Sequence, residues 1–348
     1  MRRLQRSLTG LALLLPLLAA QTAAAQGTLE QIRVFGPSLE GNLEGNDPNR
    51  EVFVYLPPGY AESDERYPVV YYLHGYSVGA QAYVNLLGLP GAGDEAIAAG
   101  GREMILVLPD GNSRHSGSLY SNSPTTGDFE GFIAKDLVAY IDANYRTIAA
   151  RESRGLSGHS MGGYGTMRIG MKHPEVFGAL FAMSSCCLLN QAPSREAVEQ
   201  QVARLSAPPQ EAAGGRGGRG GRGGRGGGFG NALLAQAAAW APNPDNPPLY
   251  FDWPYENGEL NPIVEAKWAA NSPLVFVDQY VPGLESYRAI YIDVGDQDGL
   301  MATNVQLSEA LERLGVEHEF EVYEGDHGNR VAQRFRENVV PFFAEHLR

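Results

Sequence analysis

Short apolar runs alternate along the chain with longer amphipathic segments. Five of these runs are apolar without clean alternation, as expected of strands that helices cover on both faces; they lie at 51–56, 69–73, 104–108, 177–182 and 289–294. A last run, which alternates more, lies at 318–323. Helical spacing of apolar residues predicts helices at 129–145, 161–172, 302–314 and 329–346. Strands that alternate with helices predict an α/β domain with a mostly parallel sheet.

The stretch from about 189 to 271 breaks this rhythm, and we interpret it as a cap-like insertion in the α/β domain. It contains a glycine tract with arginine at every third position, within residues 214–230. Such a composition cannot bury a core, so we expect the tract to be disordered. All three tryptophans lie in this insertion, at Trp240, Trp253 and Trp268. They either line a substrate groove or pack the insertion onto the body, and the sequence leaves both alternatives open.

The first residues have the pattern of a secretory signal peptide. A basic start, a short apolar run and a cleavage site of small residues follow one another within residues 1–25. The apolar run is too short to span a bilayer. We therefore expect the α/β domain to occupy residues 26–348 and to be secreted or periplasmic.

The charge balance narrows the range of partners. The chain has a formal net charge of −13, and removal of the basic N-terminus would make it more negative. An acidic protein is repelled by nucleic acid and by anionic membrane surfaces, so we expect neither as a partner, and we interpret the Gly/Arg tract as a solvated loop rather than an RNA-binding segment.

Cys186 and Cys187 are the only cysteines, and they are neighbours in the sequence. This excludes a disulfide framework and a cysteine-rich zinc site. Because a ring between neighbouring residues needs strained geometry, we expect two buried thiols rather than a vicinal disulfide.

One serine has the local sequence of a hydrolase nucleophile. Ser160 stands in the segment GHSMGG, residues 158–163, between a short predicted strand at 154–157 and the helix that begins at Met161. Glycines two positions before and after the serine allow a tight strand-to-helix turn without a Cβ clash. The N–H of Met161 would then lie at a helix N-terminus, where it can stabilise an anion. We predict Ser160 as the nucleophile and the N–H of Met161 as an oxyanion donor.

A serine hydroxyl needs a base, and the base needs an orienting acid. His327 lies in a glycine-flanked loop directly after a predicted strand, where such a base is expected. Asp296 and Asp298 follow the strand at 289–294 and precede His327, which gives the chain order Ser, Asp, His of this architecture. We prefer Asp298 as the acid and keep Asp296 as the alternative.

A second oxyanion donor is expected in the loop after an early strand. Gly75 follows the run at 69–73 and permits a close approach, so the N–H of Tyr76 is the candidate. His74 is interpreted as a loop residue that closes this turn. His159, beside the serine, is expected to point away from it.

These segments together resemble a known family, the esterases of the esterase D and feruloyl esterase type, which also includes the antigen 85 mycolyltransferases. The resemblance is carried by VYLPPGY at 54–60, YLHG at 72–75, LPDG at 108–111, SMGGYG at 160–165, HPEVF at 173–177, NSPL at 271–274 and GDH at 325–327. It implies an α/β-hydrolase fold with Ser160 as nucleophile, His327 as base and Asp298 as acid, and with oxyanion donors at Met161 and Tyr76. The family's aspartate follows a Gly-x-x-Asp pattern, which the chain fits at 295–298, whereas His159 ahead of the serine and the long insertion depart from the family.

The resemblance implies a serine carboxylic-ester hydrolase that forms an acyl-enzyme on Ser160 and needs no metal or organic cofactor. Feruloyl or acetyl esters of plant polysaccharide are candidate substrates. An acyltransferase of the mycolyltransferase type would use the same residues and differ only in the group that accepts the acyl chain. A non-catalytic binding protein with a hydrolase fold is a third alternative, and the oligomeric state stays open.

Overall fold

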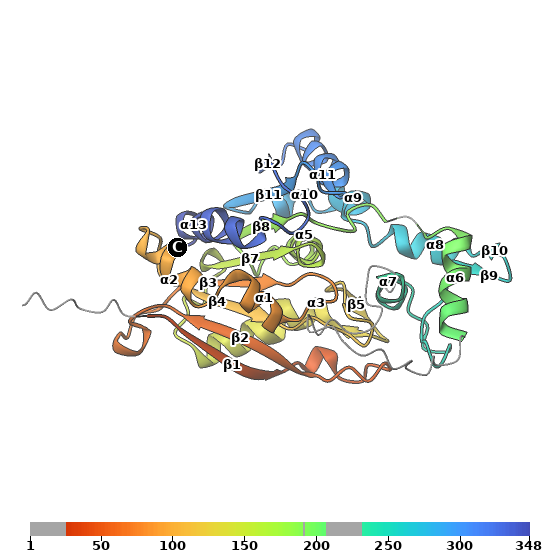
Figure 1. Cartoon of the computed structure of the whole chain (residues 1–348), viewed down its shortest axis with the longest axis horizontal. Helices are drawn as coiled ribbons and strands as arrows, with labels where there is room; N and C mark the ends of the chain where they lie inside the picture. Colours follow the sequence, from red (N-terminus) through yellow and green to blue (C-terminus); the bar gives the residue numbers. More distant parts are fainter. Residues whose placement is uncertain (1–25, 191, 207–231) are drawn as a thin grey trace, which may run out of the picture.

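An eight-stranded sheet runs through the centre of the protein in the order β1-β2-β4-β3-β7-β8-β11-β12 (Figure 1). The computed structural model describes residues 26–190, 192–206 and 232–348, so the signal-peptide pattern at 1–25 and the Gly/Arg tract at 214–230 lie outside the described residues. The strands are β1 (Thr28–Phe35), β2 (Asn49–Leu56), β3 (Val69–Leu73), β4 (Ile105–Pro109), β7 (Arg154–His159), β8 (Ala179–Met183), β11 (Ala289–Gly295) and β12 (Glu319–Tyr323). β2 pairs antiparallel with both β1 and β4, and all other pairs are parallel. The predicted mostly parallel sheet is confirmed.

Helices cover both faces of this sheet. On one face lie a continuous helix made of α3 (Phe129–Gly131), a π-helical segment (Phe132–Leu137) and α4 (Val138–Asn144), together with α5 (Met161–Lys172) and α11 (Met301–Arg313). On the other face lie α1 (Ala80–Leu87), α2 (Gly91–Ala98), and a second continuous helix made of α12 (Val331–Arg334), a π-helical segment (Phe335–Val339) and α13 (Val340–His346). The shorter elements outside the insertion are β5 (Asn122–Ser123), β6 (Gly127–Asp128), α9 (Pro273–Phe276), α10 (Val281–Leu284) and 3-10 turns at Pro37–Leu39, Tyr60–Glu62, Arg151–Ser153 and Val277–Gln279.

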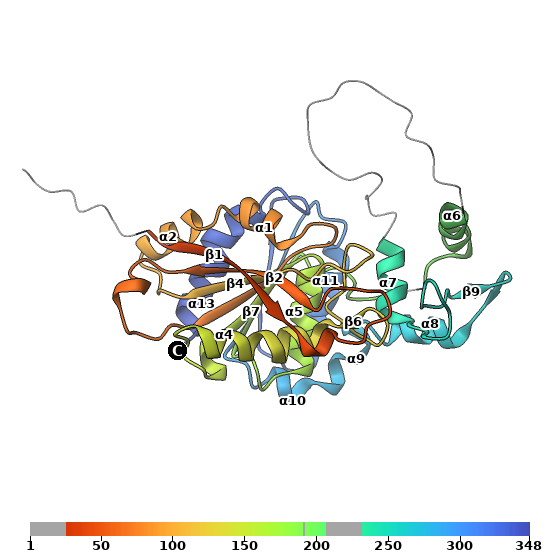
Figure 2. The ribbon, with the colours of Figure 1, turned by 90° about the horizontal axis from the view of Figure 1, so that it is seen from below.

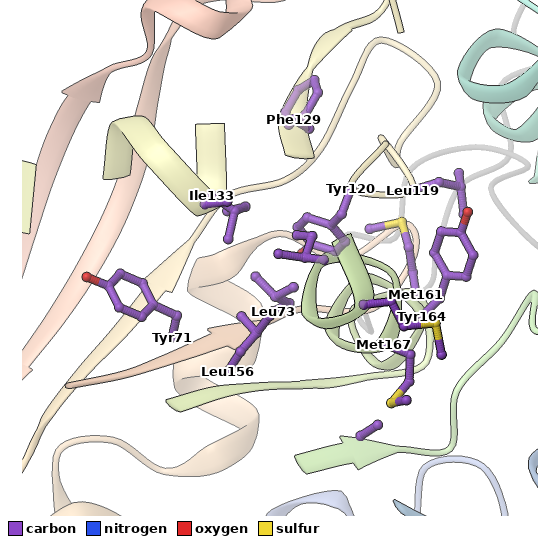
Figure 3. Packing of buried hydrophobic residues seen from close by; sticks show 14 of the residues in the cluster. Tyr71, Leu73, Leu119, Tyr120, Phe129, Ile133, Leu156, Met161, Tyr164 and Met167 are labelled. Carbon is purple, nitrogen blue, oxygen red and sulfur yellow. The ribbon is translucent and has the colours of Figure 1, made fainter. Parts of the chain in front are cut away.

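Side-chain alternation along the central strand β3 divides the core into two layers. Tyr71 and Leu73 point into the layer that contains α5, whereas Tyr72 points into the layer that contains α1 and α13. Figure 3 shows Tyr71 and Leu73 together with Leu156 of β7 and Met161 of α5 in the first layer. Because β3 is buried on both faces, its sequence VVYYL lacks charged residues and does not alternate, as the parallel arrangement requires, whereas β7 (RGLSGH) is buried over most of its length with a more polar sequence.

The stretch that the sequence marks as an insertion holds α6 (Arg195–Ser206), α7 (Ala232–Trp240), the hairpin β9 (Tyr255–Glu256) and β10 (Glu259–Leu260), and α8 (Pro262–Ala269). These elements gather at one end of the molecule in both views (Figures 1 and 2). α7 lies nearest the sheet, where the Ser123 hydroxyl of β5 donates a hydrogen bond to the Ala238 carbonyl over 2.9 Å. This contact joins the insertion to the body of the domain.

A buried ionic cluster fastens α5 to the end of the insertion. Arg168 of α5 is 4% exposed, and its Nε lies 2.7 Å from a carboxylate oxygen of Glu130. The same guanidinium donates to Asn271 over 2.8 Å. Burial alone would raise the pKa of Glu130, but the hydrogen bond from His173 and the charges of Arg168 and Lys172 lower it to about 2. Glu130 is therefore ionised at every ordinary pH.

We expect Glu130→Gln to lower the free energy of unfolding at pH 7 by about 3 kcal/mol, because it leaves the buried Arg168 without its counter-charge. The folded-state pKa of Glu130 lies below its unfolded value, so this stabilisation is present above about pH 4.5 and is lost as the pH falls towards 2. Urea unfolding at pH 7 and at pH 3 should therefore show a smaller difference between the variant and the wild type at the lower pH. The exposed Glu309→Gln is the matched control, and a Glu130 variant as stable as that control at pH 7 would contradict the prediction.

Candidate active site

Ser160 occupies the sharp turn between β7 and α5. Its backbone angles, φ of 60° and ψ of −112°, are strained for a residue other than glycine. A Cβ atom on Gly158 would lie 2.5 Å from the main chain of Gly162, and one on Gly162 would lie 2.0 Å from the carbonyl oxygen of Leu73. Neither position can carry a side chain, so the two glycines permit the close approach of helix and strand that their spacing predicts.

Three of the predicted side chains meet at the carboxyl ends of the parallel strands. Nε2 of His327, in the loop after β12, lies 2.9 Å from the Ser160 hydroxyl, and Nδ1 lies 2.8 Å from Oδ2 of Asp298, in the loop after β11. The Asp298 side chain is 2% exposed. Burial acts to raise the pKa of Asp298, but hydrogen bonds from His327 and from the Leu300 N–H hold it below its ordinary value. An ionised Asp298 accepts a hydrogen bond from Nδ1–H of His327, so the hydrogen stays on Nδ1 and Nε2 is free to accept the hydroxyl proton of Ser160.

Asp296, the alternative acid, forms hydrogen bonds with the main chain of the segment that leads to His327. Its Oδ1 accepts a hydrogen bond from the N–H of Gly325 over 3.0 Å, and its own N–H donates to the Tyr323 carbonyl over 2.8 Å. These bonds tie the end of β11 to the start of the loop that carries His327. The structure thus places Asp298 against the histidine and Asp296 against the histidine's loop.

The residues that carry the two predicted oxyanion donors line the same cavity as the serine. Met161 is the first residue of α5, so its N–H belongs to the helix N-terminal group that has no intrahelical partner. A Cβ atom built on Gly75 would lie 3.5 Å from Cβ of Ser160, so the loop after β3 approaches the serine closely. Tyr76 follows Gly75 and lines the same cavity as Ser160 and Met161.

His74 closes the loop that carries Tyr76. The side chain is buried, its Nδ1 donates to the Gly75 carbonyl over 2.8 Å, and its Nε2 accepts the N–H of Gly111 over 2.7 Å. Burial lowers the pKa of His74, so the neutral ring keeps this donor-and-acceptor pattern. The imidazole therefore fastens the loop after β3 to the loop after β4, in agreement with its interpretation as a turn-closing residue.

A cavity of about 640 Å³ opens beside Ser160. Its wall is largely apolar and is shared between the body, which supplies Leu119 and Met161, and the insertion, which supplies Trp240 and Trp268. The two indole rings meet edge-to-face with centroids 5.3 Å apart, so these tryptophans both line the cavity and pack the insertion. Trp253 packs against Phe251 instead, with centroids 5.1 Å apart.

The two cysteines border the same cavity as free, half-buried thiols. Their Sγ atoms lie 2.7 Å apart, and the N–H of Cys186 donates to the Ser160 carbonyl over 3.1 Å. The hydrogen bond with Cys187, together with burial, raises the pKa of the Cys186 thiol. A protonated thiol is a poor nucleophile, so the raised pKa disfavours attack by Cys186.

Two residues that line the cavity lie outside the predicted set. Leu119 lies in the loop after β4, outside the LPDG segment, and Gln236 lies on the alanine-rich helix α7; both line the cavity without any local pattern that marks them. Among the described residues, no three His, Cys, Asp or Glu side chains gather as metal ligands would. No described helix has the length and apolar character that crossing a membrane requires.

Two relatives are similar to part of the chain. Esterase Rv1288 of Mycobacterium tuberculosis (strain ATCC 25618 / H37Rv) is 34% identical over 129 residues, which make up 36% of this chain and 26% of the relative. An endo-1,4-beta-xylanase/feruloyl esterase of Xylanibacter ruminicola is 34% identical over 133 residues, 36% of this chain and 18% of the relative. The matches thus span about a quarter or less of the length of these relatives.

Solved structures share the fold over nearly the whole chain. A ferulic acid esterase superposes with a TM-score of 0.64 at 21% identity, covering 93% of this chain and 100% of its own. FphF, a fluorophosphonate-binding serine hydrolase of Staphylococcus aureus, superposes with a TM-score of 0.61 at 16% identity, covering 92% and 99%. The strand order and these superpositions identify the fold as that of the α/β-hydrolases, as expected from the sequence.

The sequence model of the family described as "Putative esterase" matches residues 46–344, a span that includes both core layers and the loops that carry Ser160, Asp298 and His327. The chain belongs to this esterase family of the α/β-hydrolase superfamily.

Proposed function

We propose that the protein is a serine carboxylic-ester hydrolase that works through an acyl-enzyme on Ser160. One observation carries the proposal: the Ser160 hydroxyl, His327 and Asp298 form a continuous hydrogen-bonded chain at the wall of an apolar cavity. The esterase family to which the chain belongs supports the same reaction class. A nucleophile, a base and an acid in this order are sufficient for acyl transfer.

In the proposed mechanism each group has one role. His327 takes the proton of Ser160 through Nε2 as the serine oxygen attacks the ester carbonyl, and Asp298 stabilises the imidazolium that forms. The N–H groups of Met161 and Tyr76 donate to the oxyanion of the tetrahedral intermediate. The alcohol then leaves with the proton from His327. A water molecule, deprotonated by the same imidazole, attacks the acyl carbon; the bond to the Ser160 oxygen breaks, that oxygen takes back the proton from His327, and the acid is released.

The cavity favours a bulky, apolar acyl group. An aromatic wall with a few polar groups at its edge suits an aryl acid such as ferulate better than acetate alone, because burial of the ring supplies the binding energy. A feruloyl esterase among the relatives and a ferulic acid esterase among the similar structures support this substrate class. The signal-peptide pattern at residues 1–25 supports a secreted or periplasmic enzyme that meets feruloylated or acetylated plant polysaccharide.

Four reagents test the proposal. The protein is incubated with p-nitrophenyl acetate, a fluorophosphonate probe, methyl ferulate and an acetylated xylan oligomer. We expect hydrolysis of p-nitrophenyl acetate, labelling of the peptide that contains Ser160, and a higher kcat/KM on methyl ferulate than on the acetylated oligomer. Acyl groups that pass to an added sugar rather than to water would indicate an acyltransferase, and a chain that neither labels nor hydrolyses would be a binding protein.

Removal of the Trp240 indole should separate bulky from small esters. We expect Trp240→Ala to lower kcat/KM on methyl ferulate by about tenfold or more, and on p-nitrophenyl acetate by less than about threefold, because only the larger acyl group reaches this wall. The ratio of kcat/KM on methyl ferulate to kcat/KM on p-nitrophenyl acetate does not depend on the fraction of folded protein in the sample. Trp253→Ala is the matched control, since Trp253 packs against Phe251. An equal drop of kcat/KM on both esters in the Trp240 variant would show that Trp240 does not contribute to recognition of the acyl group.

A further inference from the structure

His159 directly precedes Ser160, yet its side chain is directed to the opposite side of β7, as expected. The ring is 5% exposed. Its Nε2 lies 2.7 Å from the carbonyl oxygen of His327, and its Nδ1 lies 2.7 Å from the hydroxyl of Tyr83 on α1. Both ring nitrogens of a buried imidazole are thus hydrogen-bonded, one of them to the main chain of the residue that faces Ser160.

The partners determine where the proton sits on this ring. A carbonyl oxygen only accepts, so Nε2 of His159 carries a hydrogen and donates to His327. Nδ1 then accepts the Tyr83 hydroxyl, provided that the ring is neutral. Burial first, and the neighbouring His327 second, lower the pKa of His159 to about 4, and the more distant charge of Asp298 opposes this. The ring is therefore neutral at neutral pH.

Tyr83 connects this ring to the loop that carries the second oxyanion donor. A Cβ atom built on Gly75 would lie only 2.5 Å from the Tyr83 hydroxyl oxygen, so the hydroxyl lies directly against that loop. Burial raises the pKa of Tyr83, and a hydrogen bond from the Gly75 main chain acts in the opposite direction. The hydroxyl thus lies against the Gly75 main chain and donates to His159.

We propose that Tyr83 and His159 form a hydrogen-bond relay that runs from the Gly75–Tyr76 loop to the His327 carbonyl and positions His327 against Ser160. The inference rests on the proposed function, since it assigns positioning residues to the same site. The relay adds a main-chain restraint on His327 that the bond between its side chain and Asp298 does not supply. It also places a neutral ring beside His327, with centroids 4.8 Å apart, so that the imidazolium formed during acyl transfer meets no second positive charge.

A space-filling role alone explains these contacts poorly. An aliphatic side chain would fill the same volume, whereas a buried imidazole is costly unless both nitrogens are hydrogen-bonded. The relay satisfies both, and it joins α1, β7 and the loop after β12 at the nucleophile.

Two amide substitutions of His159 test the two hydrogen bonds of the relay separately. In His159→Gln the side-chain amide can reach the position of Nε2 and donate to the His327 carbonyl, whereas in His159→Asn it reaches only the position of Nδ1. We expect kcat on p-nitrophenyl acetate to fall about tenfold in the Asn variant with KM within twofold, and to stay within about threefold of wild type in the Gln variant. Tyr83→Phe should lower kcat by about threefold to tenfold. Tyr72→Phe, which removes another buried hydroxyl in the same core layer, is the control and should leave kcat unchanged.

The rate is expressed per active site, titrated with the fluorophosphonate probe. A merely structural role would reduce the number of titrated sites and leave kcat per site unchanged, and this result would overturn the proposal. Equal kcat in the Asn and Gln variants, or equal kcat in Tyr83→Phe and Tyr72→Phe, would overturn it as well. The Tyr83 comparison stands on its own if the His159 variants do not fold.

One measurement is independent of turnover. The ¹⁵N shifts of the His159 ring in wild-type protein, assigned by difference from the His159→Gln variant, should show the neutral tautomer with hydrogen on Nε2 at pH 7. Hydrogen on Nδ1 would overturn the relay even in an active esterase. Conversely, the expected tautomer in a protein that fails to hydrolyse any ester would keep the relay as a structural fact and reject the proposed function.

Discussion

Replacement of Ser160 by alanine is expected to lower kcat/KM on p-nitrophenyl acetate by about 10⁴-fold or more. The substitution removes the oxygen proposed to form the acyl-enzyme, while the proposed oxyanion donors and the cavity remain. Folding should be preserved, because alanine fits in the volume of serine and the substitution removes no packing contact of the hydrophobic core. Labelling by a fluorophosphonate should disappear together with turnover.

Ser157→Ala provides the matched control for the nucleophile. Ser157 lies on the same strand β7, is buried, and among the described residues its hydroxyl has no hydrogen-bond partner. This variant should keep wild-type turnover and labelling. Normal activity in the Ser160 variant would reject Ser160 as the nucleophile and, with it, the acyl-enzyme mechanism.

Asp298→Asn is expected to lower kcat by about 10³- to 10⁴-fold, since an amide in place of the carboxylate no longer holds the Nδ1–H tautomer of His327 or stabilises the imidazolium. Asp296→Asn should cost only a few-fold. Its remaining amide oxygen can still accept the Gly325 N–H, and Asp296 touches the loop rather than the ring. Comparison of kcat for both variants on one ester measures the difference, and the opposite ranking would make Asp296 the orienting acid.

The sequence predicts the interior of this fold better than its edges. β3, β4 and β8 are buried along their whole length, so each gives an apolar run that marks a strand. β1 does not, because it is an edge strand whose side chains mostly face solvent, and a search for apolar runs passes over it. α2 is also missed, since its glycines and alanines give little helical periodicity.

The same distinction applies to the site. The position of Ser160 follows from local sequence, since two glycines and a helix start define its turn within six residues. The assignment of Asp298 and His327 follows from the order serine, aspartate, histidine along the chain. The relay through Tyr83 and His159 joins residues 76 positions apart, and its last bond spans 168 positions. No local pattern encodes such contacts, so only the folded arrangement shows them.

Because the body and the insertion share the wall of the cavity, the reaction chemistry and the preference for an acyl group depend on different elements. The groups proposed for bond breaking sit at the ends of sheet strands, whereas Trp240 and Trp268 sit on α7 and α8 of the insertion. Substitutions on those two helices can therefore change which acid is released while leaving the reacting atoms in place. For directed evolution, this makes α7 and α8 the segments to randomise when a new acyl preference is sought, and it makes loop exchange with a related esterase a practical route to a hybrid catalyst.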